Sequence, residues 1–217
     1  MVVLSSADYF MFGELAPNAD DVWGGWLGWF EDGEWSTLEL VDSRILSAVV
    51  GPDGSVFAHF VERVQGDPIF FHSLRRIRSD GLVGWELELP RGVVNYNLRG
   101  DERGGVYVDV ELGEAGGTEM RRYDEDGALS WAVPYEPGPY VRMTAHAGSG
   151  AETVLVHFRD YESDFELIRL DARGEERCRT RFPERGITGW GRDAFVQGDR
   201  FHLMRDDSLE IFRFLEP

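Results

Sequence analysis

The stretch YDEDGALSWAVP, residues 123–134, places three acidic residues directly before Gly127 and a tryptophan four residues after it. Such a run of carboxylates could form a calcium loop, an active-site loop or a tight turn. Aligned with an EF-hand loop, it puts Arg122 and Val133 at the two outer ligand positions, where carboxylates are required. We therefore predict a hairpin turn in which Gly127 adopts a positive φ, and no bound metal.

The same turn pattern recurs along the chain at nearly constant intervals. Its glycines are Gly33, Gly81, Gly127 and Gly174, which are 48, 46 and 47 residues apart. Four residues after the last three glycines come Trp85, Trp131 and Cys178. We predict that these three residues are structurally equivalent and buried, with Cys178 in a tryptophan position.

A second series of strand-like runs has a similar period: SVFAHF (55–60), GVYVDV (105–110), TVLVHF (153–158) and RFHLM (200–204). Runs rich in Val, Phe and Tyr between turn residues indicate β-strands. Four strands in each repeat of 40–50 residues are typical of a β-propeller. A β-sandwich is the alternative, but it would not predict the regular spacing of glycine and tryptophan.

The predicted fold class is therefore all-β, a β-propeller of five small four-stranded blades of about 47 residues each. One domain covers residues 1–217, with repeats at about 1–42, 43–90, 91–136, 137–184 and 185–217. Residues 68–77 have helical spacing, but the repeat favours a strand there and leaves a short helix open. We expect residues 2–6 to lie beside the last repeat and close the ring.

The segments LDARGE (170–175) and YDEDGALSW (123–131) resemble the repeat of the PQQ-like, or quinoprotein-like, propellers. Blades of that family read leucine–aspartate–x–x–glycine followed by tryptophan. The resemblance implies a propeller fold and a binding scaffold. The dehydrogenases of the family use a larger ring with calcium and a quinone at its centre, and nothing in this sequence matches those ligands. We therefore expect no cofactor and no enzymatic activity.

Other residues capable of chemistry have simpler interpretations. Three of the five histidines, His59, His157 and His202, align at one position of the second strand, where the third repeat has Asp109. They could ring a metal, but equivalent positions of separate blades lie far apart, so we predict packing roles. Cys178 lacks a recognisable catalytic partner. We therefore assign neither catalytic nor metal-binding residues.

Composition narrows the choice of partner. The chain has 217 residues, 42% of them hydrophobic, and a net charge of −18. This charge disfavours nucleic acid and anionic membranes and favours basic partners. All 22 basic residues are arginines, and Cys178 is the single cysteine, which suits a reducing compartment. With no secretion signal or membrane span recognisable, we expect a cytoplasmic protein.

Two groups of residues are candidates for partner binding: Trp23, Trp26 and Trp29, and Arg177, Arg179 and Arg181. The tryptophans lie in a segment with four such residues between positions 22 and 35, and the arginines alternate along one face of an outer strand. We predict an acidic interaction module that binds a basic protein partner, such as an immunity protein or an assembly subunit. The alternatives are a carbohydrate- or small-molecule-binding propeller, or a glycoside hydrolase with paired carboxylates.

Overall fold

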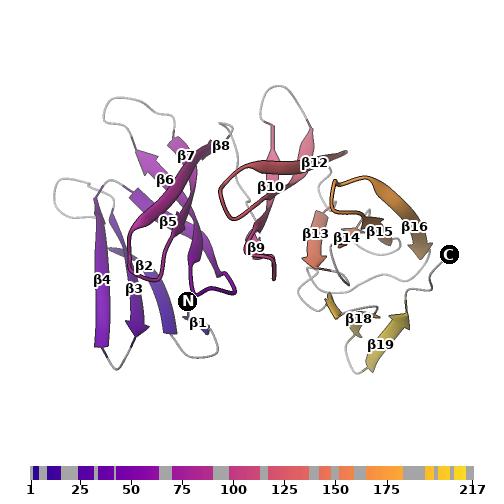
Figure 1. The fold of residues 1–217 in the computed structure, drawn as a ribbon, viewed down its shortest axis with the longest axis horizontal. Coiled ribbons are helices and arrows are strands. Elements are labelled where there is room, and N and C mark those ends of the chain that lie inside the picture. Colours follow the sequence, from indigo (N-terminus) through magenta and orange to yellow (C-terminus); the bar gives the residue numbers. More distant parts are fainter. Residues whose placement is uncertain are drawn as a thin grey trace. The chain divides into compact units, whose positions relative to one another are not determined.

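The fold is described from a computed structural model of the chain (Figure 1). It describes residues 2–4, 9–15, 24–31, 34–41, 43–63, 70–89, 98–112, 117–136, 142–147, 152–158, 165–182, 194–197, 200–205 and 208–213. Trp23 lies outside these ranges, as do the Gly33 of the first repeat and residues 5 and 6 of the proposed closing segment.

All regular structure in these ranges is β-strand, arranged in five antiparallel sheets. The first contains β1 (Val2–Leu4), β2 (Tyr9–Leu15), β3 (Gly24–Glu31) and β4 (Glu34–Val41). The second contains β5 (Ser43–Val50), β6 (Val56–Arg63), β7 (Phe70–Ile77) and β8 (Val83–Leu89). Residues 70–77 thus form a strand, not a helix.

The third sheet contains β9 (Leu98–Gly100), β10 (Val106–Glu111), β11 (Thr118–Tyr123) and β12 (Leu129–Tyr135). The fourth contains β13 (Arg142–Ala147), β14 (Thr153–Phe158), β15 (Phe165–Leu170) and β16 (Glu176–Phe182). The fifth contains β17 (Ala194–Gln197), β18 (Arg200–Arg205) and β19 (Ser208–Arg213). Strands neighbouring in sequence are neighbours in each sheet, which is the meander expected of a propeller blade.

The acidic stretch at residues 123–127 is a turn, as predicted. Asp124 N donates to Ala128 O at 3.0 Å, and Gly127, at φ 81°, donates back to Asp124 O at 3.1 Å. The Asp124 carboxylate accepts the backbone N–H groups of Asp126 and Ala128 at 3.0 and 2.8 Å. Its Oδ1 therefore stabilises the turn by accepting these two hydrogen bonds. The same pair of backbone bonds closes four further turns, which begin at Gly51, Arg78, Asp101 and Asp171.

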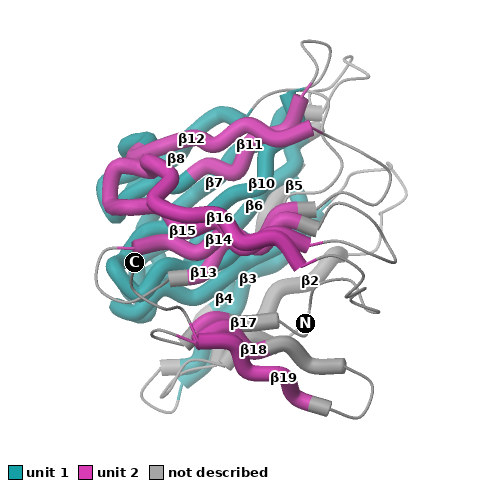
Figure 2. Tube along the Cα trace, turned by 90° about the vertical axis from the view of Figure 1, so that its right-hand side faces the viewer, with its two compact units in different colours: residues 1–116, 122–129 teal, residues 117–121, 130–217 magenta. Residues whose placement is uncertain are grey.

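The chain divides into two compact units (Figure 2): residues 1–116 with 122–129, and residues 117–121 with 130–217. In the first unit, one core packs Phe57 and Leu74 against Val108, and another packs Leu27 against Ile45 and Phe60. In the second unit, Val156, Phe165 and Leu167 of the fourth sheet pack against Phe201 of the fifth. Each core therefore lies between the faces of successive sheets.

Two of the repeat tryptophans pack on the turn of the next hairpin. A Cβ added to Gly127 would lie 2.9 Å from Cδ2 of Trp85, and one added to Gly174 would overlap the Cβ of Trp131. Trp85 also donates from Nε1 to the carbonyl of Glu125 at 2.9 Å. Glycine is required in these turns both for its positive φ and for this close approach.

Cys178 occupies the predicted position but is not buried. It pairs with Arg169, five residues before Gly174, just as Trp85 pairs with Arg76, five residues before Gly81. Its side chain is nevertheless exposed. The register was therefore right and the burial wrong. The physical reason is that no turn glycine covers Cys178 within the described part of the fifth sheet.

The expected closing strand is also not where we placed it. Val2–Leu4 pairs with β2 of the first sheet, with Val2 opposite Met11, and the fifth sheet ends at β19. The first sheet therefore has four strands and the fifth has three among the described residues. The expectation that this segment closes the ring was wrong because residues 2–4 are the first strand of their own sheet.

Candidate functional site

The tryptophan-rich segment forms the hairpin of β3 and β4. Trp26 lies in β3 and is half-buried, whereas the side chain of Trp29 is outside the described set. Leu27, next to Trp26, is fully buried in the core against Ile45 and Phe60. Because neighbouring residues of a strand point to opposite faces, Trp26 lies on the face away from that core.

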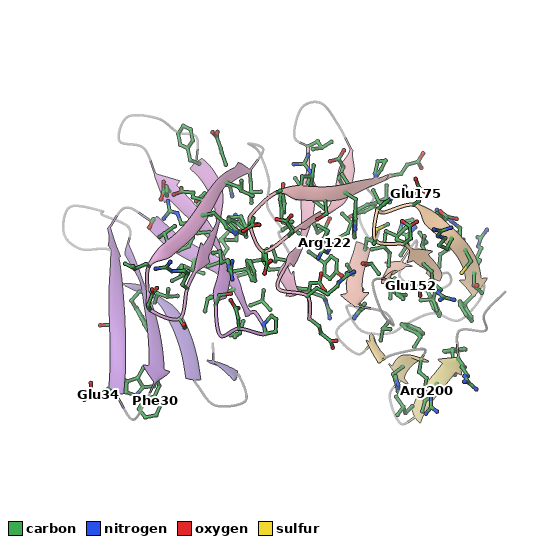
Figure 3. All side chains as sticks on the ribbon, in the orientation of Figure 1. Phe30, Glu34, Arg122, Glu152, Glu175 and Arg200 are labelled. Carbon is green, nitrogen blue, oxygen red and sulfur yellow. The ribbon has the colours of Figure 1, made fainter. Side chains whose placement is uncertain are left out.

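Trp35, which the sequence analysis did not single out, is the exposed tryptophan of this hairpin. Its side chain is 51% exposed, and its ring lies 5.4 Å from that of Phe30. The two residues are cross-strand partners beside the turn, and Glu34 is exposed next to them. Figure 3 shows Phe30 and Glu34 at the turn end of the hairpin. The sequence signal for this difference was the position of Trp35, which follows Gly33 by two residues, whereas Trp85 and Trp131 follow their glycines by four.

The three predicted arginines lie on β16, and all are exposed along with most of that strand. Arg177 binds Asp171 at 2.7 Å, and Arg179 binds Glu176 at 2.7 Å and the buried Glu166 at 2.9 Å. The carboxylates that neutralise Arg177 and Arg179 are thus on β15, its turn and β16.

These ion pairs shift the pKa values of the acids and of Arg179 in opposite directions. The hydrogen bond from Arg179 lowers the pKa of Glu176, and its partners together raise the pKa of Arg179. The pKa of Asp171 is lowered first by the backbone N–H of Glu175 and then by that of Arg173, with Arg177 adding to the effect. The arginine row therefore carries positive charge that is partly balanced by its own sheet.

The aligned histidines do not share one structural position. Phe57 pairs with Arg76 and Val154 with Arg169, so these two pairs are equivalent in the second and fourth sheets. His59 lies two residues after Phe57, but His157 lies three residues after Val154. A shift of one residue reverses the face of a strand. The predicted equivalence of His59 and His157 was therefore wrong.

Each histidine packs in its own surroundings. His59 is fully buried and forms a 2.9 Å hydrogen bond from ring to ring with His72. Burial, and secondarily the neighbouring His72, lowers the pKa of His59 to about 3. His157 lies 3.5 Å from Glu166 and edge-on to Tyr135. No group of three metal-binding side chains occurs in the described ranges.

The buried acids are also tied into the fold. Asp101 is 1% exposed, and Arg103 and Arg122 bind its two oxygens at 3.0 and 2.7 Å. Burial alone would raise its pKa, but these bonds outweigh burial, so the pKa of Asp101 is lowered. Glu166 is likewise held by Arg179. Acids neutralised by arginines are suited to holding strands and turns together, not to paired general acid–base chemistry.

Comparison with known proteins identifies the fold. No model of a known protein family matches the chain, and no curated protein matches it. The β-propeller domain of the Trilobed protease from Pyrococcus furiosus, described as having an open velcro topology, matches with a TM-score of 0.63 at 10% identity. That match covers 100% of this chain and 68% of the other.

Two further matches are peptidases of the prolyl type. Prolyl oligopeptidase B from Galerina marginata gives a TM-score of 0.51 at 13% identity, and a prolyl endopeptidase gives 0.55 at 12%. The alignments cover 98% and 94% of this chain but only 31% and 30% of those proteins. The chain thus spans about a third of their length. It has a β-propeller fold built from sheets of antiparallel strands.

These matches contradict one prediction. We expected a protein without enzymatic activity, and the matched structures described above belong to a protease and to peptidases. The resemblance to a quinoprotein repeat correctly indicated a propeller, but it did not point to peptidase propellers. At 10–13% identity the likeness shows the fold alone.

Proposed function

We propose that this chain is an acidic propeller module that captures a basic polypeptide partner. The observation that carries the proposal is Trp35, which is 51% exposed beside Phe30 on a chain of net charge −18. The charge attracts a basic surface over a distance, and the aromatic pair offers apolar area that can be desolvated on contact. A basic toxin or a basic assembly subunit would have the required chemistry.

The predicted binding residues have different parts in this proposal. Trp35 replaces Trp23 and Trp29 as the anchor that the described structure supports, and half-buried Trp26 lies in the adjacent strand. The arginines of β16 belong to the other compact unit and form a second candidate surface. Because their charge is partly balanced by Asp171, Glu176 and Glu166, we assign them a polar contact surface of their own, separate from the Trp35 anchor.

The finer features of the fold belong to the same proposal. We infer five blades, one for each sheet. We also infer that the glycine turns are encoded by a PQQ-like sequence repeat. In the part of the chain that is described, no helix is long and apolar enough to cross a bilayer. A reducing cytoplasm fits the exposed, unpaired thiol of Cys178.

A second candidate function follows from the comparisons. The matched propellers belong to enzymes that act on polypeptides, so this chain could serve as the polypeptide-contacting propeller of a peptidase. In both candidate functions the bound molecule is a polypeptide. They differ in whether a catalytic domain accompanies the propeller.

The test is a pull-down from the native cell at about 50 mM and about 500 mM salt, analysed by mass spectrometry. Wild type should retain basic proteins at low salt and lose most of them at high salt. Trp35→Ala should fail to retain them at either salt concentration. Leu129→Ala, which removes an apolar side chain that is 52% exposed elsewhere, should behave like wild type. Retention unaffected by salt and by Trp35→Ala would overturn the proposal, and recovery of a peptidase domain would favour the second candidate.

A further inference from the structure

The fifth sheet has an outer edge that differs from those of the other four. Four sheets have four strands, whereas within the described ranges the fifth ends at β19. Leu209 and Ile211 of β19 are 51% and 52% exposed, while Phe212 between Ile211 and Arg213 packs against Phe182 of the fourth sheet. One face of β19 is therefore covered, and its other face carries the exposed side chains of Leu209, Ile211 and Arg213.

A second observation points to the same place. Cys178 of the fourth sheet is equivalent to Trp85 and Trp131, which both pack on the glycine turn between the third and fourth strands of the following sheet. Cys178 is exposed instead. Among the described residues nothing covers the edge of β19 or the position of Cys178, and these are the two places that a fourth strand and its turn contact in the other sheets.

The backbone of β19 can accept such a strand. Arg205 pairs with Ser208 across a two-residue connection, which makes them a hydrogen-bonding pair, and such pairs alternate along a ladder. The N–H groups of Ser208, Glu210 and Phe212 therefore face β18. Those of Leu209 and Ile211 face outward, where a new strand would pair with them.

We propose that the outer edge of β19 binds an extended basic polypeptide segment as the fourth strand of the fifth sheet. The inference rests on the proposed function, because it takes the basic partner from there and adds a second contact, on the other compact unit, that would hold an extended segment of that partner. Backbone bonds would supply affinity, and alternate apolar side chains of the segment would cover Leu209 and Ile211. Its remaining side chains would carry the basic charge.

Charge favours such a partner over a second copy of this chain. Each copy carries a net charge of −18, so two copies repel each other. Antiparallel self-pairing that brings Leu209 opposite Ile211 would also place the Glu210 carboxylates of the two copies opposite each other. Like charges directly opposite in a sheet are destabilising.

The test uses a labelled peptide of alternating arginine and valine, as long as the outer strands of the other sheets, and its binding measured by fluorescence anisotropy. The control peptide has the same composition with N-methylated valines, which cannot pair as a strand. On the protein, Ile211→Pro removes one outward N–H and leaves the ladder to β18 intact, while Ile211→Ala removes the side chain and keeps the N–H. Melting temperatures of the two variants verify that both fold.

We expect the unmodified peptide to bind wild type and Ile211→Ala, and to bind Ile211→Pro at least about tenfold more weakly. Equal salt-sensitive binding of both peptides to every variant would overturn strand addition and leave capture of basic polypeptides standing. Failure of wild type to bind either peptide would overturn the proposed function as well. A dimer seen by ultracentrifugation that Ile211→Pro disperses would show that a second copy takes the edge, and would also overturn the proposal.

Discussion

Strands β8 and β16 hold the same place in their hairpins but differ in burial. In β8, Leu89 is buried and Trp85 is half-buried against the turn that contains Gly127. In β16, every residue before Phe182 is exposed. Because both strands have the same register relative to their turns, the difference does not come from pairing. It comes from what the following sheet supplies to cover the strand.

The covered strands depend on glycine in the next turn, and this dependence gives the largest predicted effect. Gly174→Ala should lower the free energy of unfolding by about 2–5 kcal/mol, since it combines a strained positive φ with overlap onto Trp131. Gly54→Ala is the matched control, because φ is also positive there but the nearest atom is 3.9 Å from the added Cβ. Chemical denaturation of both variants checks the difference. Equal losses would show that only φ matters and that the packing on Trp131 contributes nothing.

The sequence predicts the register of these strands better than it predicts which neighbouring residues surround them. Glycine spacing located the turns that begin at Arg78, Asp124 and Asp171, because a positive φ imposes a strong residue preference. Burial of Cys178 was not predictable from that spacing, since burial depends on a neighbouring sheet. The histidine alignment failed because His157 lies one residue further along its strand than His59 does, which places it on the other face. Exposure of Trp35 likewise follows from its place beside a turn and not from composition.

Truncation of the covering tryptophan tests the same contact from the other side. Trp85→Ala should cost about 2–3 kcal/mol of unfolding free energy, less than a fully buried tryptophan because the side chain is only half-buried. The loss includes ring contacts with Gly127 and Phe57 and the bond to the Glu125 carbonyl. Calorimetry of the variant measures it. A cost below about 0.5 kcal/mol would mean that β8 is no better anchored than β16.

The covered face of the second sheet also contains the buried His59–His72 pair, which predicts a pH effect. The pKa of His59 is lowered to about 3 from the 6.5 of an unfolded chain, so the unfolded state binds more protons between these values. Stability is then complete above about pH 6.5 and falls as the pH drops, by up to about 2 kcal/mol at pH 5. Denaturation between pH 7 and pH 5 measures the slope. The double variant His59→Gln with His72→Gln should flatten it, and an unchanged slope would place the proton uptake elsewhere.

The smallest predicted effect is at Cys178, where the absence of a described cover should make substitution nearly neutral. Cys178→Ala and Cys178→Trp should each change the free energy of unfolding by less than about 0.5 kcal/mol. A thiol-reactive probe should label Cys178 in the native protein about as fast as in the unfolded chain, because the side chain is exposed. A tryptophan at this position gains nothing unless a glycine turn packs on it, as Gly127 packs on Trp85. If Cys178→Trp stabilised the protein by about 1 kcal/mol or more, a cover would have to exist over β16, and the contrast between the two outer strands would disappear.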